Sequence, residues 1–324
     1  MEANKELGFD IADYNANKLG ASQTQINTIN GKRLDDAKAF LHPVRQRKNL
    51  KILTHSYVTK ILTDKGVATA VEFSHKGKNY FVEVNKEVIL AAGTIGTPQI
   101  LMWSGIGPKR HLNNLKIDVV ADLEVGTVLR DNTLFYGITI HTNYTEPVRP
   151  LRDYVEDYLK GVGPFTIANN LAGVGFYESS YTKGTGTPDI ELVFIPANAT
   201  NSLSAKRVGL TEETYEDLWK NVDVPQSLVV YVVSLHDVST GTVRLKSKNP
   251  YDYPMIDSNF LSDRGNKDIK IIYEGIQLVL KLLKTKAFRK MNATLQGRPL
   301  RACRKHEYLS EGYWYCAIRQ VSSN

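Results

Sequence analysis

The 324-residue sequence predicts an α/β unit followed by an α+β unit. Val88–Ala92 is an apolar run without alternation, as is typical of a strand covered on both faces of a parallel sheet. Several short β runs separated by turns precede it, and stronger β runs followed by one long amphipathic segment come after residue 132. We therefore expect two domains, residues 1–132 and 133–324.

The apolar run leads directly into a predicted helix. Gly93 ends the run, and Thr97 with Pro98 favours a helix start, because threonine can cap free amides and proline is tolerated at the first helical position. The free amides and positive dipole end of such a helix favour a phosphate or another anion. An ordinary crossover helix would give the same pattern, so both interpretations stay open.

A β-meander is predicted before this strand. The expected strands are Lys51–Thr54, Val58–Leu62, Val67–Phe73 and Tyr80–Val84. Turn chemistry at Asp64-Lys65-Gly66 and at His75-Lys76-Gly77-Lys78 separates the last three strands. A meander inserted between two strands of a parallel sheet is the arrangement found in one class of nucleotide-binding domains.

The second half of the chain reads as a mostly antiparallel sheet that could form the floor of a substrate cavity. A short helix is expected at Leu151–Lys160, and Lys267–Phe288 has apolar residues at helical spacing on one face. The expected strands are Ile190–Ile195, Leu228–Leu235 and Thr242–Leu245.

Composition excludes several classes of protein. With 42% hydrophobic and 23% charged residues, the chain can bury a sizeable core. The net charge of +7 could suggest nucleic acid, but Lys and Arg are scattered, and their densest group, Lys281–Lys290, falls at a predicted helix end. We therefore expect no nucleic-acid partner. No apolar run is long enough to span a bilayer, so no membrane span is expected either.

The two cysteines and three glycosylation sequons leave localisation open. Cys303 and Cys316 do not form a Cys-x-x-Cys site, and a disulfide and free buried thiols are both compatible with the sequence. Asn-x-Thr sequons begin at Asn143, Asn198 and Asn292, a number that chance would also supply in a chain this rich in asparagine.

Other site chemistries find little support. The seven histidines show no metal-ligand spacing. No Gly-x-Ser-x-Gly motif occurs, and Ser104 in Trp-Ser-Gly-Ile-Gly looks like a helix end. His236-Asp237 could in principle form an acid–base pair, but we expect an ordinary surface turn there.

A family resemblance covers nearly the whole chain. Gly93–Gly107 resembles the second signature of the glucose–methanol–choline oxidoreductases, flavoenzymes that oxidise alcohols with FAD. Other family-like segments follow in family order: Ala39–Pro43 with Arg47–Leu50, Gly241–Leu245 with Asn249-Pro250 and Pro254–Ile256, and Tyr313-Trp314 with Arg319-Gln320. The chain is most similar to the arthropod glucose-dehydrogenase and ecdysone-oxidase branch.

The resemblance implies a fold, a cofactor and a substrate class. It implies a partial FAD-binding, Rossmann-like domain with a β-meander, then a substrate domain whose mostly antiparallel sheet has helices on one side. A small-molecule alcohol is the implied substrate, whether sugar, steroid or other. Val58 matches a backbone contact to the adenine side of FAD, and Gly93 lies where the ribose–phosphate approaches. The implied cofactor-binding residues are Val58, Ala92, Gly93, Thr94, Thr97, Asp131 and Asn132.

Several family features are missing from this sequence. It holds no GxGxxG turn near its start and no His-Pro-x-Gly-Thr segment, where the family keeps its catalytic histidine. Val128 stands for a family asparagine and Asn132 for a histidine near the flavin. We therefore expect an internal fragment with no catalytic residue of its own, doubtful FAD binding and no activity as it stands. The alternative is a non-catalytic remnant that binds a small ligand or a partner. Oligomeric state is left open.

Overall fold

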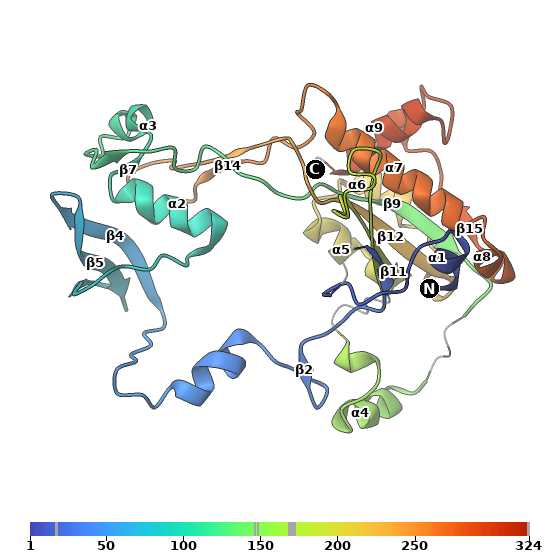
Figure 1. The fold of residues 1–324 in the computed structure, drawn as a ribbon, viewed down its shortest axis with the longest axis horizontal. Coiled ribbons are helices and arrows are strands. Elements are labelled where there is room, and N and C mark those ends of the chain that lie inside the picture. Colours follow the sequence, from blue (N-terminus) through green and yellow to red (C-terminus); the bar gives the residue numbers. More distant parts are fainter. Residues whose placement is uncertain (17–18, 146, 148, 168–172, 323–324) are drawn as a thin grey trace. The chain divides into compact units, whose positions relative to one another are not determined.

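The computed structural model describes residues 1–16, 19–145, 147, 149–167 and 173–322 (Figure 1). The chain divides into two compact units. The sheet unit comprises residues 1–39, 132–238 and 261–324, and the meander unit comprises residues 40–131 and 239–260. Each unit is described by itself below.

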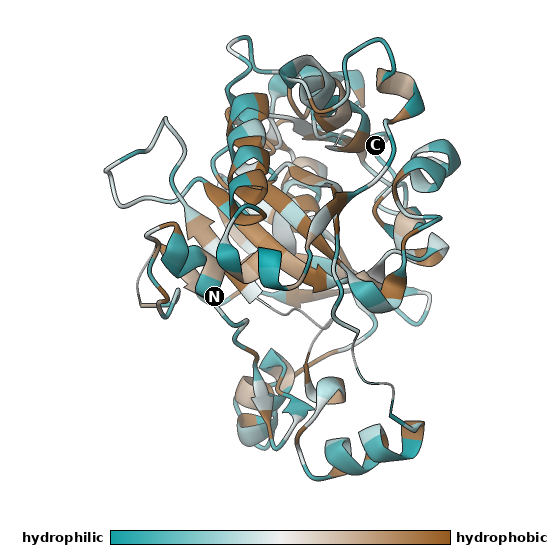
Figure 2. Cartoon of the chain, turned by 90° about the vertical axis from the view of Figure 1, so that its right-hand side faces the viewer, coloured by the Kyte–Doolittle hydropathy of each residue, from teal (hydrophilic) through white to brown (hydrophobic). Residues whose placement is uncertain are grey.

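An antiparallel sheet with the strand order β1-β10-β11-β12-β9-β15 forms the centre of the sheet unit. Its strands are β1 (Gly20–Ser22), β9 (Leu134–His141), β10 (Gly173–Tyr177), β11 (Ile190–Pro196), β12 (Ser227–Ser234) and β15 (Thr294–Gln296). The strands predicted at 190–195 and 228–235 are confirmed as β11 and β12. Apolar residues concentrate in these strands (Figure 2), and this accounts for the buried core of the unit.

Two helices pack on one face of this sheet. Helix α7 (Lys267–Leu282) contacts β11 and β12, and α9 (Glu311–Ser322) contacts β9. Gly275 lies in the α7 contact, where an added Cβ would overlap Cγ1 of Val232 and touch Ile190. The fully buried residues of α7 at helical spacing are Ile269, Ile272, Ile276 and Val279. The expected mostly antiparallel sheet with helices on one side is therefore present.

The helix predicted over 267–288 is split into two. Helix α7 ends at Leu282 and α8 (Lys286–Lys290) begins after Thr285. The Thr285 hydroxyl accepts a hydrogen bond from the amide of Phe288, so threonine starts a new helix instead of continuing the first. Apolar spacing alone runs through this break and hides it.

Shorter elements complete the sheet unit. The helix predicted at 151–160 is α4 (Leu151–Leu159). The other elements are α1 (Glu2–Glu6), β2 (Thr28–Ile29), β3 (Lys32–Arg33), η3 (Pro164–Thr166), η5 (Ala197–Ala199), α5 (Ser202–Arg207), α6 (Glu212–Leu218), η6 (Val224–Gln226) and η7 (Arg301–Cys303), with η1 (Ala37–Leu41) at the unit boundary.

The meander unit contains the expected three antiparallel strands. They are β4 (Ser56–Asp64), β5 (Val67–His75) and β6 (Lys78–Glu83), and the segment 51–54 is not a strand. Both connecting turns place Lys-Gly pairs at positive φ, 49° and 83° at Lys65-Gly66 and 50° and 74° at Lys76-Gly77, as tight hairpin turns require. The remaining elements are η2 (His42–Val44), α2 (Gly93–Trp103), β7 (Ile106–Gly107), α3 (Lys109–Asn114), β8 (Ala121–Asp122), β13 (Thr242–Arg244) and β14 (Met255–Asp257).

The prediction of a buried parallel strand at Val88–Ala92 is wrong for this structure. These residues form no strand, and Ile89 is 81% exposed. A covered strand needs neighbours on both sides, yet among the described residues the parallel pairings are β7 with β8 and a bridge from Ile11 to Ala21. The apolar run is present, but no described strand pairs with it.

The helix after this run begins four residues earlier than predicted. Helix α2 starts at Gly93, whose φ of +78° turns the chain into the helix, and Pro98 lies inside it. Thr97 is therefore a residue of the second turn and not the cap. Gly93 therefore sets the first residue of the helix, whereas the Thr97-Pro98 pair predicted a start that lies too late in the chain.

The boundaries of the two units differ from the expected domains, 1–132 and 133–324, because two segments belong to the other unit. Residues 1–39 join the sheet unit, since the hydroxyl of Tyr177 donates to Oδ1 of Asn4 at 2.5 Å and Ala21 pairs with Gly175. Residues 239–260 join the meander unit, where the amide of Val243 donates to the carbonyl of Gly126 at 2.9 Å. Both segments are assigned by contacts between residues far apart in the chain, and local composition carries no signal for such contacts.

Candidate functional site

Helix α2 is held against the meander by Ser104. The Ser104 hydroxyl accepts from the amide of Ile61 on β4 at 2.8 Å and donates to the carbonyl of Ile100 at 2.6 Å. A buried apolar cluster that includes Ile61, Ile100 and Met102 surrounds this contact. Ser104 therefore fixes the end of α2 on the meander, in agreement with its expected place at a helix end.

The start of α2 is open. Gly93 and Thr94 are exposed, and a Cβ added to Gly93 would meet nothing within 4 Å. The first turn holds no acidic residue, so its amides and the helix dipole favour an anion. These features suit the phosphate-side role implied for Gly93.

The implied cofactor residues fall mainly on the meander unit. Val58 lies on β4 opposite Phe73 and packs against the cluster beneath α2. The meander unit holds Val58, Ala92, Gly93, Thr94, Thr97 and Asp131, while Asn132 is in the sheet unit. The structure therefore places the positions implied for the adenine and phosphate sides on one compact unit.

The two positions that depart from the family have different surroundings. The side-chain amide of Asn132 donates to the carbonyl of Ser234 at 2.9 Å, which ties it to the end of β12. Val128 is 63% exposed. Asn132 thus has a structural contact in the sheet unit, whereas Val128 presents an apolar surface to solvent.

The neighbouring His236-Asp237 pair is divided between two environments. His236 is exposed, as expected for a turn, but Asp237 is half-buried. Its carboxylate accepts from the amide of Thr133 at 2.7 Å and from the Thr133 hydroxyl, and burial raises the pKa of Asp237. Asp237 therefore anchors the segment that enters β9, a role that the sequence did not indicate.

The sheet face opposite α7 carries polar and aromatic side chains that the sequence analysis did not single out. Because Ile190 and Val232 face α7, strand alternation places Glu191 and Tyr231 on the other face. Tyr136 packs edge-on against Tyr231 at 5.0 Å and against Trp219 at 6.3 Å between ring centroids. Glu191 interrupts an otherwise apolar strand, a signal that could have identified this face.

Burial raises the pKa of Glu191 above its ordinary value. A carboxyl group whose folded-state pKa is raised stabilises the fold below its unfolded pKa and loses this contribution as pH rises through the folded pKa. We expect Glu191→Gln to make stability less dependent on pH above the ordinary pKa of glutamate, about 4.3, and to increase it at pH values above the raised pKa. Urea unfolding at several pH values measures this. Glu307→Gln, at an exposed position of the same unit, is the matched control, and an equal response of both variants would contradict the expectation.

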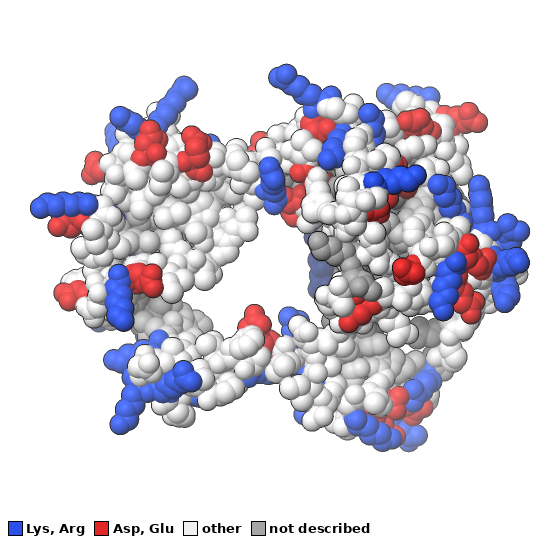
Figure 3. Space-filling view, viewed as in Figure 1, with Lys and Arg blue, Asp and Glu red and all other residues white. Residues whose placement is uncertain are grey.

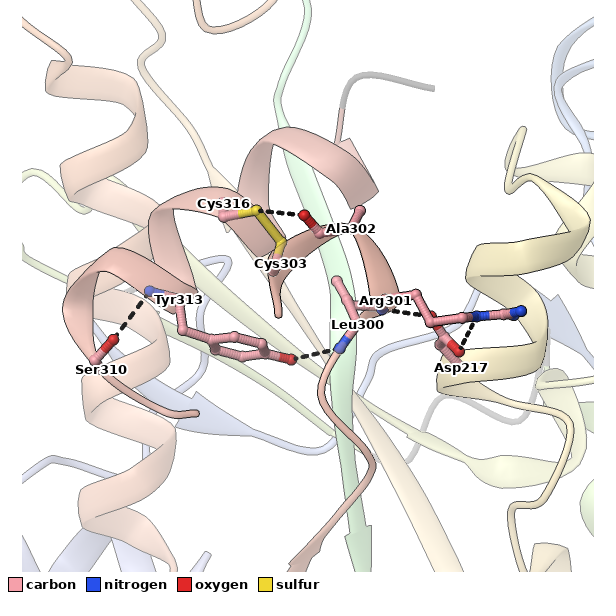
Figure 4. Close-up of a disulfide and its surroundings, with 8 residues drawn as sticks. All are labelled: Asp217, Leu300, Arg301, Ala302, Cys303, Ser310, Tyr313 and Cys316. Carbon is pink, nitrogen blue, oxygen red and sulfur yellow. Dashed lines mark hydrogen bonds and ion pairs between the residues drawn. A yellow bond between two sulfur atoms is a disulfide. The ribbon is translucent and has the colours of Figure 1, made fainter. Parts of the chain in front are cut away.

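A disulfide joins Cys303 on η7 to Cys316 on α9, with the Cα atoms 5.8 Å apart (Figure 4). Beside it, the hydroxyl of Tyr313 accepts from the amide of Leu300 at 3.3 Å. Of the alternatives left open by the sequence, the structure has the disulfide. It fixes α9, the helix that carries the Tyr-Trp and Arg-Gln pairs of the family resemblance.

The described residues offer neither a metal-binding cluster nor a membrane-spanning helix. In that part of the chain, no group of three or more His, Cys, Asp or Glu side chains could hold a metal ion. No helix within the described ranges has the length and apolar character needed to cross a membrane. Basic and acidic side chains are interspersed on the visible face (Figure 3), and no extended basic patch appears there.

The comparisons identify the relatives of this chain. Models of the N- and C-terminal domains of the GMC oxidoreductases match residues 1–133 and 237–324. The chain is 30% identical to "Glucose dehydrogenase [FAD, quinone]" of Drosophila melanogaster, over 99% of this chain and 50% of that protein. It is 31% identical to "Ecdysone oxidase" of Spodoptera littoralis, over 94% of this chain and 51% of that protein. The chain spans about half the length of the curated relatives it matches.

Solved structures support the same fold. A formate oxidase from Aspergillus oryzae matches with a TM-score of 0.75 and 22% identity, over 98% of this chain and 57% of that chain. An FAD-dependent oxidoreductase from Chaetomium thermophilum matches with a TM-score of 0.74 and 22% identity, over 99% of this chain and 59% of that chain. Since the two family models together match more than half of its residues, this chain belongs to the GMC oxidoreductase family.

Proposed function

We propose that this chain is part of an FAD-dependent oxidoreductase that oxidises the CH–OH group of a small alcohol. The observation that carries the proposal is the meander unit, in which Val58 and the open start of α2 lie on one compact body. The names of two relatives, a glucose dehydrogenase and an ecdysone oxidase, support a sugar or steroid alcohol as substrate.

The meander unit fits the adenine and phosphate side of FAD. The space above Gly93 is free, and the exposed first turn of α2 offers amide donors without acidic competition. Val58 would contribute its backbone, while Ala92, Thr94 and Thr97 would shape the helix entry. Asp131 and Asn132 are proposed for the flavin side, with Asn132 already bonded to Ser234. Bound FAD would supply the hydride acceptor.

The sheet unit would hold the alcohol. The face opposite α7 offers the half-buried rings of Tyr136 and Tyr231, which provide apolar contact with hydroxyl groups at one end. Glu191, on the same face, would position a substrate hydroxyl as a hydrogen-bond partner.

We further propose that the 324 residues alone are catalytically silent and are an internal piece of the enzyme. The sequence holds neither a GxGxxG turn nor a His-Pro-x-Gly-Thr segment, and the exposed Ile89 run lacks a strand partner among the described residues. The alternative, a non-catalytic remnant that binds a ligand or partner, is favoured by Val128 and Asn132 at the two departing positions.

The test compares this chain with the product of the extended transcript. We expect flanking sequence to encode both missing motifs, and the extended product to purify yellow and reduce a dye acceptor with glucose or an ecdysteroid. The 324-residue chain should be colourless after gel filtration, since it lacks the loop that would hold the pyrophosphate.

Two outcomes would contradict the proposal in different ways. Stoichiometric flavin bound to the 324-residue chain would contradict the proposal that this chain alone is colourless and inactive. An extended product that carries both motifs but stays colourless would favour the remnant. In that case, Val128→Asn with Asn132→His tests the decay of the site, because a restored hydrogen bond to a charged group is worth about 1.5 to 3 kcal/mol, or roughly ten- to a hundredfold in rate.

A further inference from the structure

The three Asn-x-Thr sequons lie at the same end of the sheet. One row of paired residues crosses the adjacent strands β11, β12, β9 and β15. In that order, its members are Pro196, Leu228, Ile140 and Leu295. Asn198 follows this row after β11, Asn143 follows it after β9, and Asn292 precedes it before β15. Since β15 runs antiparallel to β9, all three asparagines project past one edge of the row.

Direct contacts confirm how close two of these segments are. The amide of Asn143 donates to the carbonyl of Met291 at 2.8 Å, so the first and third sequons are neighbours. Asn143, Asn198 and Asn292 are all exposed. An exposed asparagine at a loop or strand end has room for a bulky sugar without disturbing the core.

The disulfide supplies the second, independent observation. Cys303 is fully buried and bonded to Cys316, and the described residues include no free cysteine. Disulfides of this structural kind form and persist in oxidising compartments, which in eukaryotes are those that also attach N-linked glycans. The number of sequons alone carries no weight, but exposure, shared location and the disulfide point to the same compartment.

We propose that Asn143, Asn198 and Asn292 are N-glycosylated and that the chain matures in an oxidising secretory compartment. The glycans would cover the sheet end formed by the end of β9, the end of β11 and the start of β15. Glycans are hydrophilic and bulky, so they would keep this end in solvent and exclude protein contacts from it. The proposal does not depend on the proposed catalytic function.

The decisive measurement uses the protein isolated from its source tissue. Treatment with peptide N-glycosidase in heavy-oxygen water converts each glycosylated asparagine to labelled aspartate, which peptide mass spectrometry detects. We expect the label at all three sequons and a disulfide-linked peptide containing both cysteines. An unlabelled sequon, or two free thiols, would overturn the proposal.

Variants of the full chain, secreted from cultured cells behind a signal sequence, assign the individual sites. Asn143→Gln and Asn198→Gln should each remove one step from the glycosidase-sensitive gel shift. At the third sequon the threonine is changed instead, because Asn292 has a φ of +48°, which asparagine tolerates better than glutamine.

Thr294 is exposed and offers a matched pair of substitutions. Thr294→Val removes the sequon and keeps the β-branched shape, so it should lose one step, whereas Thr294→Ser keeps the sequon and should lose none. Because sugars are attached to the chain before folding is complete, the gel shift is read in cell extracts even where a variant fails to fold. An unchanged shift in any of the three sequon-removing variants would overturn the assignment of that site.

Discussion

Asp189→Ala is expected to lower the free energy of unfolding of the sheet unit by about 3 to 5 kcal/mol. Asp189 is fully buried just before β11 and accepts three hydrogen bonds. The donors are the Ser179 amide at 2.7 Å, the Ser179 hydroxyl at 2.5 Å and the Thr182 hydroxyl at 2.9 Å. Removal of the carboxylate leaves buried donors without a partner, and each lost bond to a charged group costs about 1.5 to 3 kcal/mol.

Glu178→Ala is the matched control for this prediction. Glu178 accepts from the amides of Gly184 and Gly186 in the same β10–β11 connection, but it is only half-buried and these bonds are exposed, so water can replace it. Urea unfolding should give a large loss for Asp189→Ala and a much smaller one for Glu178→Ala. Equal losses would mean that burial of the carboxylate does not determine its contribution.

The sequence predicted best those elements whose signals are local. The meander follows from three short runs and two Lys-Gly turns, and each turn encodes its own backbone conformation at Lys65-Gly66 and Lys76-Gly77. Val88–Ala92 failed because a buried parallel strand is defined by its neighbours, which an apolar run cannot supply by itself.

Residues of the candidate site were proposed from the sequence only where a long motif covered them. Gly93 comes from the signature, and its role stays a prediction, although its surroundings are open. The second face of the sheet was missed, since Tyr136, Tyr231 and Trp219 come together from two strands and from the turn after α6, which lie far apart in the chain. Likewise Asp237 looked like part of a turn, because its partner Thr133 is distant in sequence.

Removal of the disulfide is expected to have the other large effect. The bonded cysteines are separated by 13 positions, and a cross-link closing a loop of about 15 residues stabilises a fold by about 3 kcal/mol in the chain-entropy model. The double variant Cys303→Ala with Cys316→Ala should therefore lose about that much free energy of unfolding. Alanine is used because Cys303 is fully buried and a serine hydroxyl would need a partner there.

Removal of the disulfide should loosen helix α9 first, because Cys316 lies on this helix. Trp314 on α9 packs edge-on against Phe135 of β9, with ring centroids 6.3 Å apart, so a loosened helix would uncover the sheet core. Wild-type protein unfolded in the presence of dithiothreitol should approach the double variant, while the variant itself should not respond to the reductant. If wild type and variant unfold at the same urea concentration without reductant, α9 is held by its apolar contacts and the disulfide adds nothing measurable to the fold.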